Sequence, residues 1–451
     1  MIRPAAAAAL VLAAVLAGCT GGSSATSAGV PAAAPAGCRT PAYPAPAADR
    51  PRYLLRLTID PTAHRVQGTV AVAFTPDIAT DRLVFRLWAN GPVLRGEGAD
   101  MVAGPVTVDG ATAASHLADP TTLVVPRTIA AGATVHASLP FRLTLPQRAK
   151  DRISQNGTAI RLGSFFPLLP WEPGVGWALQ PPTLANGETS SSPIADFDAT
   201  IHAPPGLGVV AGGVPAGPGH WVADDVRDFG VATGDFTYVR RTVHAPGPVR
   251  LTVAVPSGVA EQADQAAGEA QVAIEHLSRL YGPYPWKTLT LAYGPDLNEE
   301  GIEYPTILFE GPDRLGLITA HEIAHQWFYS LVGNNQARDP WLDEGFASFA
   351  GAETSGDLPF FAKRRLQPPA AGHMGAPMSY WDHNQGAYFA GVYAQPVQVL
   401  QSFGSQPKVE CALRRYVARN AYRIATDADA MAAFSTEFPD ARAVFAHAGV
   451  P

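Results

Sequence analysis

The sequence has little charge and few cysteines. Asp, Glu, Lys and Arg make up only 16% of the 451 residues, whereas 47% are hydrophobic, so the composition is that of a folded chain and not a disordered one. The net charge is -7 and no basic run occurs, which argues against a nucleic-acid-binding surface. Beyond the N-terminal segment, no apolar stretch is long enough for a membrane-spanning helix. Internal repeats and a nucleotide-binding glycine loop are absent too.

The N-terminal segment predicts export. A positive start, Met1-Ile2-Arg3, precedes an apolar run over residues 5–17 that is too short to span a membrane. The run ends in Leu16-Ala17-Gly18-Cys19, which looks like the lipobox of bacterial lipoproteins; a plain secretory signal cut nearby is the alternative. We expect residues 1–18 to be a signal peptide and residues 19–48 a flexible Gly/Ser/Ala/Pro tether. The protein would then be exported, with a lipid anchor on Cys19 holding it at the cell membrane outside the cytoplasm.

Two further cysteines remain once Cys19 is assigned to lipid. Cys38 and Cys411 form an even pair, and an oxidising compartment makes a disulfide between them plausible. Two unpaired thiols are the alternative, because the sequence does not show whether the two sites meet.

The first folded part has the pattern of β-strands. The chain is long enough for two domains. From about Arg52 to His244, short segments alternate apolar and polar residues with period two between Pro, Gly, Asp and Asn, as in Tyr53 to Ile59. This predicts a predominantly antiparallel, β-sandwich-like domain over residues 49–245. The aromatic stretch Phe165 to Trp171 is expected to plug the core between sheets.

The second part, over residues 246–451, has mainly helical periodicity. Residues 260–281 repeat apolar positions every three or four residues and predict a helix that ends at Gly282-Pro283. A strand at 288–293 and a loop at 298–305 are expected next. Helical patterns continue to the last residues.

One short segment carries the clearest chemistry. The stretch Leu317 to Val332 reads LITAHEIAHQWFYSLV, in which His321, Glu322 and His325 form H-E-x-x-H. Residues four apart on a helix share a face at about 6 Å, so both imidazoles can converge on one ion, and zinc favours such ligands. Glu322 lies one residue off that face, where a general base can reach a metal-bound water without ligating the metal. An ordinary amphipathic helix with hydrogen-bonded histidines is the alternative.

An acidic residue farther along favours the zinc interpretation. Glu344 stands nineteen residues after His325 and opens a second helical pattern. If the second helix packs antiparallel to the first, it returns this carboxylate to the metal. Two histidines and one carboxylate leave a fourth position open, as in catalytic rather than structural zinc sites. We therefore predict one Zn²⁺ per chain on His321, His325 and Glu344.

Four features, in order along the chain, resemble the aminopeptidase N family of gluzincin zinc metallopeptidases over nearly all of the mature length. They are the turn Gly282-Pro283-Tyr284-Pro285, the exopeptidase motif Gly301-Ile302-Glu303-Tyr304-Pro305, the zinc signature with its eighteen-residue gap, and Val392-Tyr393-Ala394-Gln395-Pro396. The resemblance implies an α+β multidomain fold, in which an N-terminal antiparallel β domain precedes a thermolysin-like, mixed α/β and mainly helical zinc peptidase domain. It implies a short form that lacks the family's C-terminal helical domain.

The same resemblance implies the roles of single residues. Tyr393 falls where the family has its catalytic tyrosine, with Tyr380 and Tyr388 as competitors. Glu303, with Gly301, would bind the free amine of the substrate. The implied activity is that of a zinc aminopeptidase, which removes N-terminal residues from peptides by attack of a metal-activated water.

Two other functions stay open at this point. A thermolysin-like metalloendopeptidase would share the zinc motif and differ chiefly in the amine clamp, so that it would cleave N-terminally blocked peptides. A surface-anchored binding lipoprotein with an inactive peptidase fold would lack zinc and activity. Epoxide hydrolysis, found in one branch of the resembling family, has no supporting feature. The expected partners are peptides and the membrane, without nucleic acid, and the sequence does not determine the oligomeric state.

Overall fold

The structure is a computed structural model that describes residues 37–185, 191–313 and 316–451. The predicted signal peptide, Cys19 and most of the predicted tether lie outside the described residues. None of the helices in the described ranges combines the length and the apolar character that a membrane span requires.

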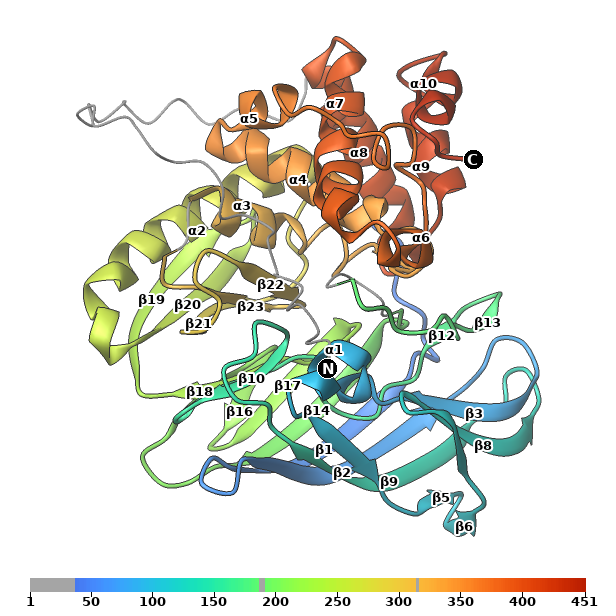
Figure 1. The fold of residues 1–451 in the computed structure, drawn as a ribbon, viewed down its shortest axis with the longest axis vertical. Helices are drawn as coiled ribbons and strands as arrows, with labels where there is room; N and C mark the ends of the chain where they lie inside the picture. Colours follow the sequence, from blue (N-terminus) through green and yellow to red (C-terminus); the bar gives the residue numbers. More distant parts are fainter. Residues whose placement is uncertain (1–36, 186–190, 314–315) are drawn as a thin grey trace, which may run out of the picture.

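The first half of the chain folds into β-sheets around one apolar core, in the lower part of Figure 1. Among the described residues the largest sheet has nine strands, in the order β16-β17-β14-β1-β2-β9-β5-β6, with β4 also paired to β9. In β1 every second side chain is buried, so one face of the sheet covers the core and the other meets water. Most pairs are antiparallel, as predicted, although β1 and β14 run parallel. The strands of this sheet are β1 (Arg52–Asp60), β2 (Arg65–Phe74), β4 (Asp100–Ala103), β5 (Val106–Val108), β6 (Ala111–Ala113), β9 (Val135–Thr144), β14 (Ala195–His202), β16 (Val214–Gly217) and β17 (His220–Val226).

Smaller sheets complete this β-rich unit. One has the order β3-β8-β7 and another the order β10-β11-β18-β15, while β12 and β13 form a hairpin. Phe165 and Phe166 are fully buried, and Phe166 packs edge-on against Tyr53 and Phe197 of the large sheet. The aromatic stretch therefore fills the core, as expected. The bounds are β3 (Thr80–Arg86), β7 (His116–Asp119), β8 (Thr122–Ile129), β10 (Ile153–Asn156), β11 (Ala159–Leu162), β12 (Trp171–Glu172), β13 (Gly176–Trp177), β15 (Gly208–Ala211) and β18 (Val231–Gly234), with the short helix α1 (Pro92–Gly96) between β3 and β4.

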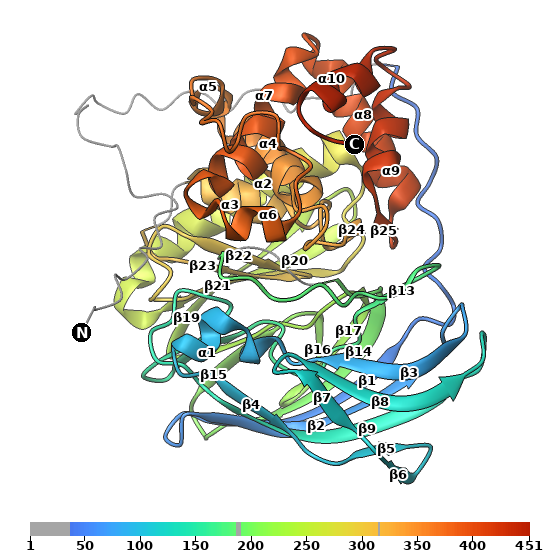
Figure 2. The ribbon, with the colours of Figure 1, turned by 45° about the vertical axis from the view of Figure 1, so that its right-hand side comes forward.

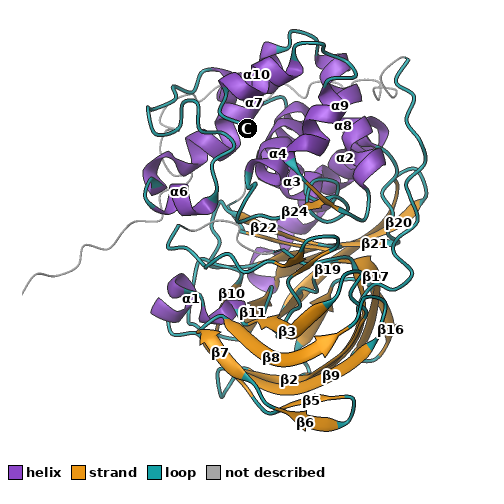
Figure 3. Ribbon diagram, turned by 90° about the vertical axis from the view of Figure 1, so that its right-hand side faces the viewer, coloured by secondary structure: helices purple, strands orange, loops and turns teal. Residues whose placement is uncertain are grey.

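The second unit combines a mixed sheet, β19-β20-β21-β23-β22, with the helices of the C-terminal half. In Figure 3 these helices (purple) gather on one side of the molecule and the sheets of the first unit (orange) on the other. Helix α2 buries an alanine-rich face, including Ala266 and Ala270, against this sheet, which confirms the predicted succession of a β-rich and a mixed α/β unit. The bounds are β19 (Phe236–His244), β20 (Pro248–Pro256), η2 (Ser257–Gln262), α2 (Ala263–Tyr281), β21 (Thr288–Tyr293), β22 (Gly301–Tyr304), β23 (Ile307–Glu310), α3 (Gly316–Ala324), α4 (Trp341–Ser355), α5 (Leu358–Ala362), α6 (Met378–Asp382), η4 (Phe389–Ala394), α7 (Gln395–Ser402), α8 (Gln406–Asn420), α9 (Asp427–Phe434) and α10 (Ala441–His447).

Two segments differ from the expectations. The predicted boundary at residues 245 and 246 leaves β19 in the first domain, yet β19 pairs along its whole length with β20 and faces the core of the second unit. The second sheet therefore begins at Phe236. The predicted loop at 298–305 contains β22, which exists because its residues pair antiparallel with β23.

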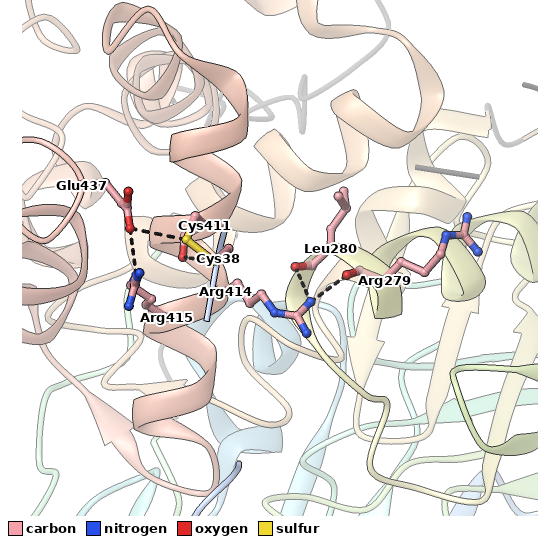
Figure 4. Close-up of a disulfide and its surroundings, with 7 residues drawn as sticks. All are labelled: Cys38, Arg279, Leu280, Cys411, Arg414, Arg415 and Glu437. Atoms are coloured by element: carbon pink, nitrogen blue, oxygen red, sulfur yellow. Dashed lines mark hydrogen bonds and ion pairs between the residues drawn. A yellow bond between two sulfur atoms is a disulfide. The ribbon is translucent and has the colours of Figure 1, made fainter. Parts of the chain in front are cut away.

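A disulfide joins the beginning of the described chain to its C-terminal part. Cys38 bonds to Cys411 of α8, across 373 positions of sequence. In Figure 2 the blue segment that follows Cys38 runs along the outside of the molecule, from the C-terminal helices to the β-rich unit. Figure 4 shows the surroundings of the bond, in which Arg414 donates to the carbonyl oxygens of Arg279 and Leu280 at the end of α2. This segment therefore ties the two units together.

Candidate metal centre and active site

Helix α3 presents the first two predicted ligands. The helix ends at Ala324, so that His325 is the first residue beyond it, but the amide of His325 still donates to the carbonyl of His321 at 3.2 Å. The two rings therefore keep the helical spacing, with Nε2 atoms 3.0 Å apart. The Nδ1 atom of His325 lies 3.0 Å from the carbonyl oxygen of Phe328 and can donate its proton to that oxygen. In the neutral ring Nε2 then carries no proton, and its lone pair faces the centre of the cluster.

Helix α4 brings the third predicted ligand. Glu344 lies in the first turn of α4 and is almost fully buried. Its Oε2 is 3.3 Å from Nε2 of His321 and 3.4 Å from Nε2 of His325. The two helices approach closely because α4 has Gly351 at the crossing, where a Cβ would lie 2.8 Å from the backbone of His321. A larger residue there would push Glu344 away from the histidines.

The spacing of these three atoms fits a tetrahedral zinc ion. Bonds of about 2.0 to 2.1 Å to a tetrahedral centre place neighbouring ligand atoms about 3.3 Å apart, and the observed separations are 3.0, 3.3 and 3.4 Å. The lone pair of His325 and the carboxylate of Glu344 are both acceptors and repel each other at this distance. A cation bound between them removes this repulsion. The chemistry of the donor set, two imidazoles and one carboxylate, is that of a catalytic zinc site.

The electrostatics of the cluster also favour a positive charge at its centre. Burial opposes the charged form of His325, but the nearby carboxylates of Glu303, Glu344 and Glu322 raise the pKa of this ring well above its ordinary value. Burial likewise opposes ionisation of Glu344, yet the neighbouring imidazoles hold its pKa well below the usual range. Burial lowers the pKa of His321, which favours the neutral, ligating form of that ring.

The predicted base and the predicted amine-binding residue lie beside the ligands. The carboxylates of Glu303 on β22 and Glu322 on α3 form a second buried cluster with His325, in which the polar atoms lie within 4.8 Å of one another. Gly301 opens β22 directly against the base: a Cβ there would lie 2.4 Å from Cγ and Oε1 of Glu322. The structure thus supplies a physical reason for glycine at this position, which is room for the Glu322 side chain.

The aromatic side of the site is formed by η4, a short π-helical segment. Its Tyr393 stacks on His321 with ring centroids 5.9 Å apart, and Phe389 covers the ring of Tyr393 at 5.2 Å. Of the competing tyrosines, Tyr388 touches the ring of Tyr393, while Tyr380 stacks on His373 and donates to the carbonyl of Pro369. Tyr393 therefore lies against a predicted ligand, and π-helical turns recur at functional sites.

Two contributors to the site were missed at the level of the sequence. Gly351 lets α3 and α4 approach, and Gln326, which directly follows His325, bonds to the strand that carries Glu303. The small residues in α4 were visible, but only the packing of the two helices reveals what they do. Cys19 lies outside the described residues, whereas the predicted pair Cys38 and Cys411 is bonded in the structure.

Comparison with known proteins agrees with this geometry. Residues 273–365, which include the H-E-x-x-H motif and Glu344, match the sequence profile of the peptidase family M1 domain. The matched segment is therefore similar to the M1 peptidase domain. Mouse aminopeptidase B is 32% identical to this chain over 111 residues, which are 23% of this chain and only 17% of that relative.

Solved M1 structures extend the similarity beyond the matched segment. The M1 zinc metallopeptidase from Deinococcus radiodurans superposes with a TM-score of 0.65 at 17% identity, over 90% of this chain and 95% of that one. A variant of the Deinococcus enzyme bound to a Tyr-Ser-Ala substrate superposes with a TM-score of 0.64 at 18% identity, over 91% and 96% of the two chains. The two units of this chain therefore share the fold of a two-domain M1 metallopeptidase.

Proposed function

We propose that the protein is a zinc-dependent aminopeptidase that removes the N-terminal residue of peptides. The observation that carries the proposal is the juxtaposition of the His321, His325 and Glu344 cluster with the carboxylates of Glu303 and Glu322. The Tyr-Ser-Ala substrate bound by the Deinococcus relative supports a peptide as the ligand class.

Each residue has a defined task in this proposal. His321, His325 and Glu344 would hold zinc, which acts as a Lewis acid on the scissile carbonyl and on water when it is bound. Glu322 takes the proton of the attacking water and passes it to the leaving amine. The hydroxyl of Tyr393 donates a hydrogen bond to the oxyanion that develops at the carbonyl.

Glu303 supplies the exopeptidase character. Its buried carboxylate lies within 4.8 Å of polar atoms of Glu322 and His325, so a free ammonium held there stands next to the zinc ligands. An ion pair in a buried, water-poor site is strong, and it fixes the distance between the terminal amine and the reacting bond. Only the first peptide bond of a substrate can then reach the base.

A paired hydrolysis assay tests the function. The purified protein is given free and N-acetylated versions of one short peptide, and its zinc content is measured in the same sample, with Glu322→Gln as a control that should bind zinc without turnover. Cleavage of the free peptide alone, with one zinc per chain, is the expected result. Cleavage of both peptides would indicate a metalloendopeptidase, and a zinc-free inactive protein would indicate a binding lipoprotein.

We further propose that the protein is exported and held at the cell membrane by lipid on Cys19. The Leu16-Ala17-Gly18-Cys19 sequence supports this, as does the disulfide, because disulfides form and persist in oxidising compartments. Bacterial cells grown with an alkyne-labelled fatty acid should yield labelled wild-type protein in the membrane fraction. The Cys19→Ser variant is the control, and equal labelling of both proteins would refute the assignment.

A further inference from the structure

A buried glutamine next to a zinc ligand is hydrogen-bonded to the turn that follows the strand carrying Glu303. Gln326 directly follows His325 and is fully buried. Its Nε2 donates to the carbonyl of Tyr304 at 3.0 Å, and its Oε1 accepts the amide N–H of Thr306 at 2.9 Å. A single amide therefore satisfies a backbone acceptor and a backbone donor on either side of Pro305, next to Glu303.

The turn that Gln326 holds is strained. Tyr304 pairs with Ile307, so Pro305 and Thr306 form a two-residue turn between β22 and β23. Thr306 has φ of 64°, the left-handed region that β-branched residues rarely adopt, and a turn with proline before a left-handed residue usually has glycine at the second place. Such a conformation persists only where its surroundings impose it.

Contacts from the β-rich unit hold the same turn from the other side. The hydroxyl of Thr306 accepts the amide N–H of Gly213 at 2.6 Å, and the hydroxyl of Tyr304 lies 3.1 Å from that of Ser164. These contacts fix β22 to the first unit but do not reach the zinc ligands. Gln326, which directly follows His325, bonds to the turn on the side of the metal site.

We infer that Gln326 is a positioning residue that sets the distance between the amine-binding carboxylate of Glu303 and the metal site. The inference rests on the proposed aminopeptidase function. If the amide is removed, the strained turn relaxes and β22 shifts relative to α3. Glu303 then no longer meets the ammonium of a substrate whose first carbonyl lies at the metal, while the metal site itself is unchanged.

A pair of inhibitors isolates this effect from catalysis. L-leucine hydroxamate carries a free amine and a metal-binding hydroxamate, whereas isocaproic hydroxamate lacks only the amine. The ratio of their inhibition constants measures amine recognition. In Gln326→Leu this ratio should fall about tenfold or more towards unity, with zinc content and the affinity for isocaproic hydroxamate retained within about threefold.

A buried glutamine elsewhere provides the matched control. Gln155 in the β-rich unit is as buried as Gln326, and its Nε2 donates to the backbone carbonyls of Pro61 and Gly157 at 2.7 Å. Gln155→Leu should lose a comparable amount of stability and keep the wild-type inhibitor ratio. Should Gln326→Leu fail to fold, Gln326→Met keeps the length of the side chain and tests the same point.

The outcomes separate this inference from the proposed function. An unchanged ratio in Gln326→Leu or Gln326→Met overturns the inference, and so does loss of zinc, which would show that Gln326 supports the metal ligands and not the amine-binding strand alone. A wild-type protein with zinc but no preference for the amine-bearing inhibitor refutes amine recognition, and the inference with it. A ratio that falls in the Gln326 variants and not in Gln155→Leu supports it.

Discussion

Replacing Gly301 by alanine should abolish most activity without unfolding the protein. The added Cβ would lie 2.4 Å from Cγ and Oε1 of Glu322, whereas carbon atoms in contact are about 3.5 to 4.0 Å apart, so the carboxylate must move by about 1 Å. A displacement of about 1 Å costs about a hundredfold in rate, and a positioned general base contributes about 10² to 10⁴. We therefore expect kcat to fall about a hundredfold, or about 2.7 kcal/mol of transition-state stabilisation.

The stability of this variant should change much less than its rate. The atoms in the way belong to the end of a side chain that can rotate, so the unfolding free energy should fall by less than about 1 kcal/mol. Gly316→Ala is the matched control, because Gly316 begins α3 and a Cβ there meets nothing within 4 Å. Peptide hydrolysis, zinc content and urea unfolding are measured for both variants. Wild-type kcat in Gly301→Ala would refute the placement of Glu322 as the base.

Three further predictions follow from single contacts. Tyr393→Phe should lower kcat about a hundredfold because the oxyanion loses a donor. Tyr380→Phe, whose hydroxyl donates to the backbone carbonyl of Pro369, should leave peptide hydrolysis unchanged, and equal losses in the two variants would contradict the assignment. Removing the 373-residue linkage by Cys38→Ser with Cys411→Ser should lower the unfolding free energy by up to about 5 kcal/mol in urea titrations, and an unchanged midpoint would show that the bond does not restrain the unfolded chain. Burial raises the pKa of Asp228 from 3.8 to about 6, so the folded state holds this proton more tightly than the unfolded chain does. Between about pH 4 and about pH 6, the unfolding free energy of the wild-type protein should therefore fall by up to about 3 kcal/mol relative to that of Asp228→Asn. If the unfolding free energies of the two proteins change in parallel with pH, the buried carboxyl has no such effect.

Local periodicity was sufficient for elements whose pattern does not depend on distant partners. The strand predicted at 288–293 is β21, and the helix predicted at 260–281 is α2 preceded by the 3-10 turn η2. Both elements alternate or repeat strongly enough to be identified alone. The spacing of His321 and His325 could be predicted locally as well, because residues four apart on one helix lie on the same face.

Elements that depend on a distant partner could not be predicted in this way. Residues 298–305 are rich in Asn, Glu, Gly and Pro and have the composition of a loop, but β22 forms there through pairing with β23. The strand β19 has no local mark that assigns it to the second unit, and only its pairing with β20 does so. The bond between Cys38 and Cys411 likewise depends on a meeting of segments 373 positions apart, which no local pattern encodes.

The metal site shows why its ligands were easier to find than the residues that support them. A ligand is constrained by chemistry, so His321 and Glu344 could be recognised from residue type and spacing. A supporting residue is constrained by the space left to it: Gly351 is glycine because the backbone of His321 lies where its Cβ would be, and Gln326 matters because a strained turn lies within reach of its amide. Such residues become visible only when the helices and strands are in place, and they decide whether the ligands converge. The motif alone therefore shows that a chain carries the ligand residues. In this chain the close packing of α3 against α4 determines whether Glu344 reaches the metal.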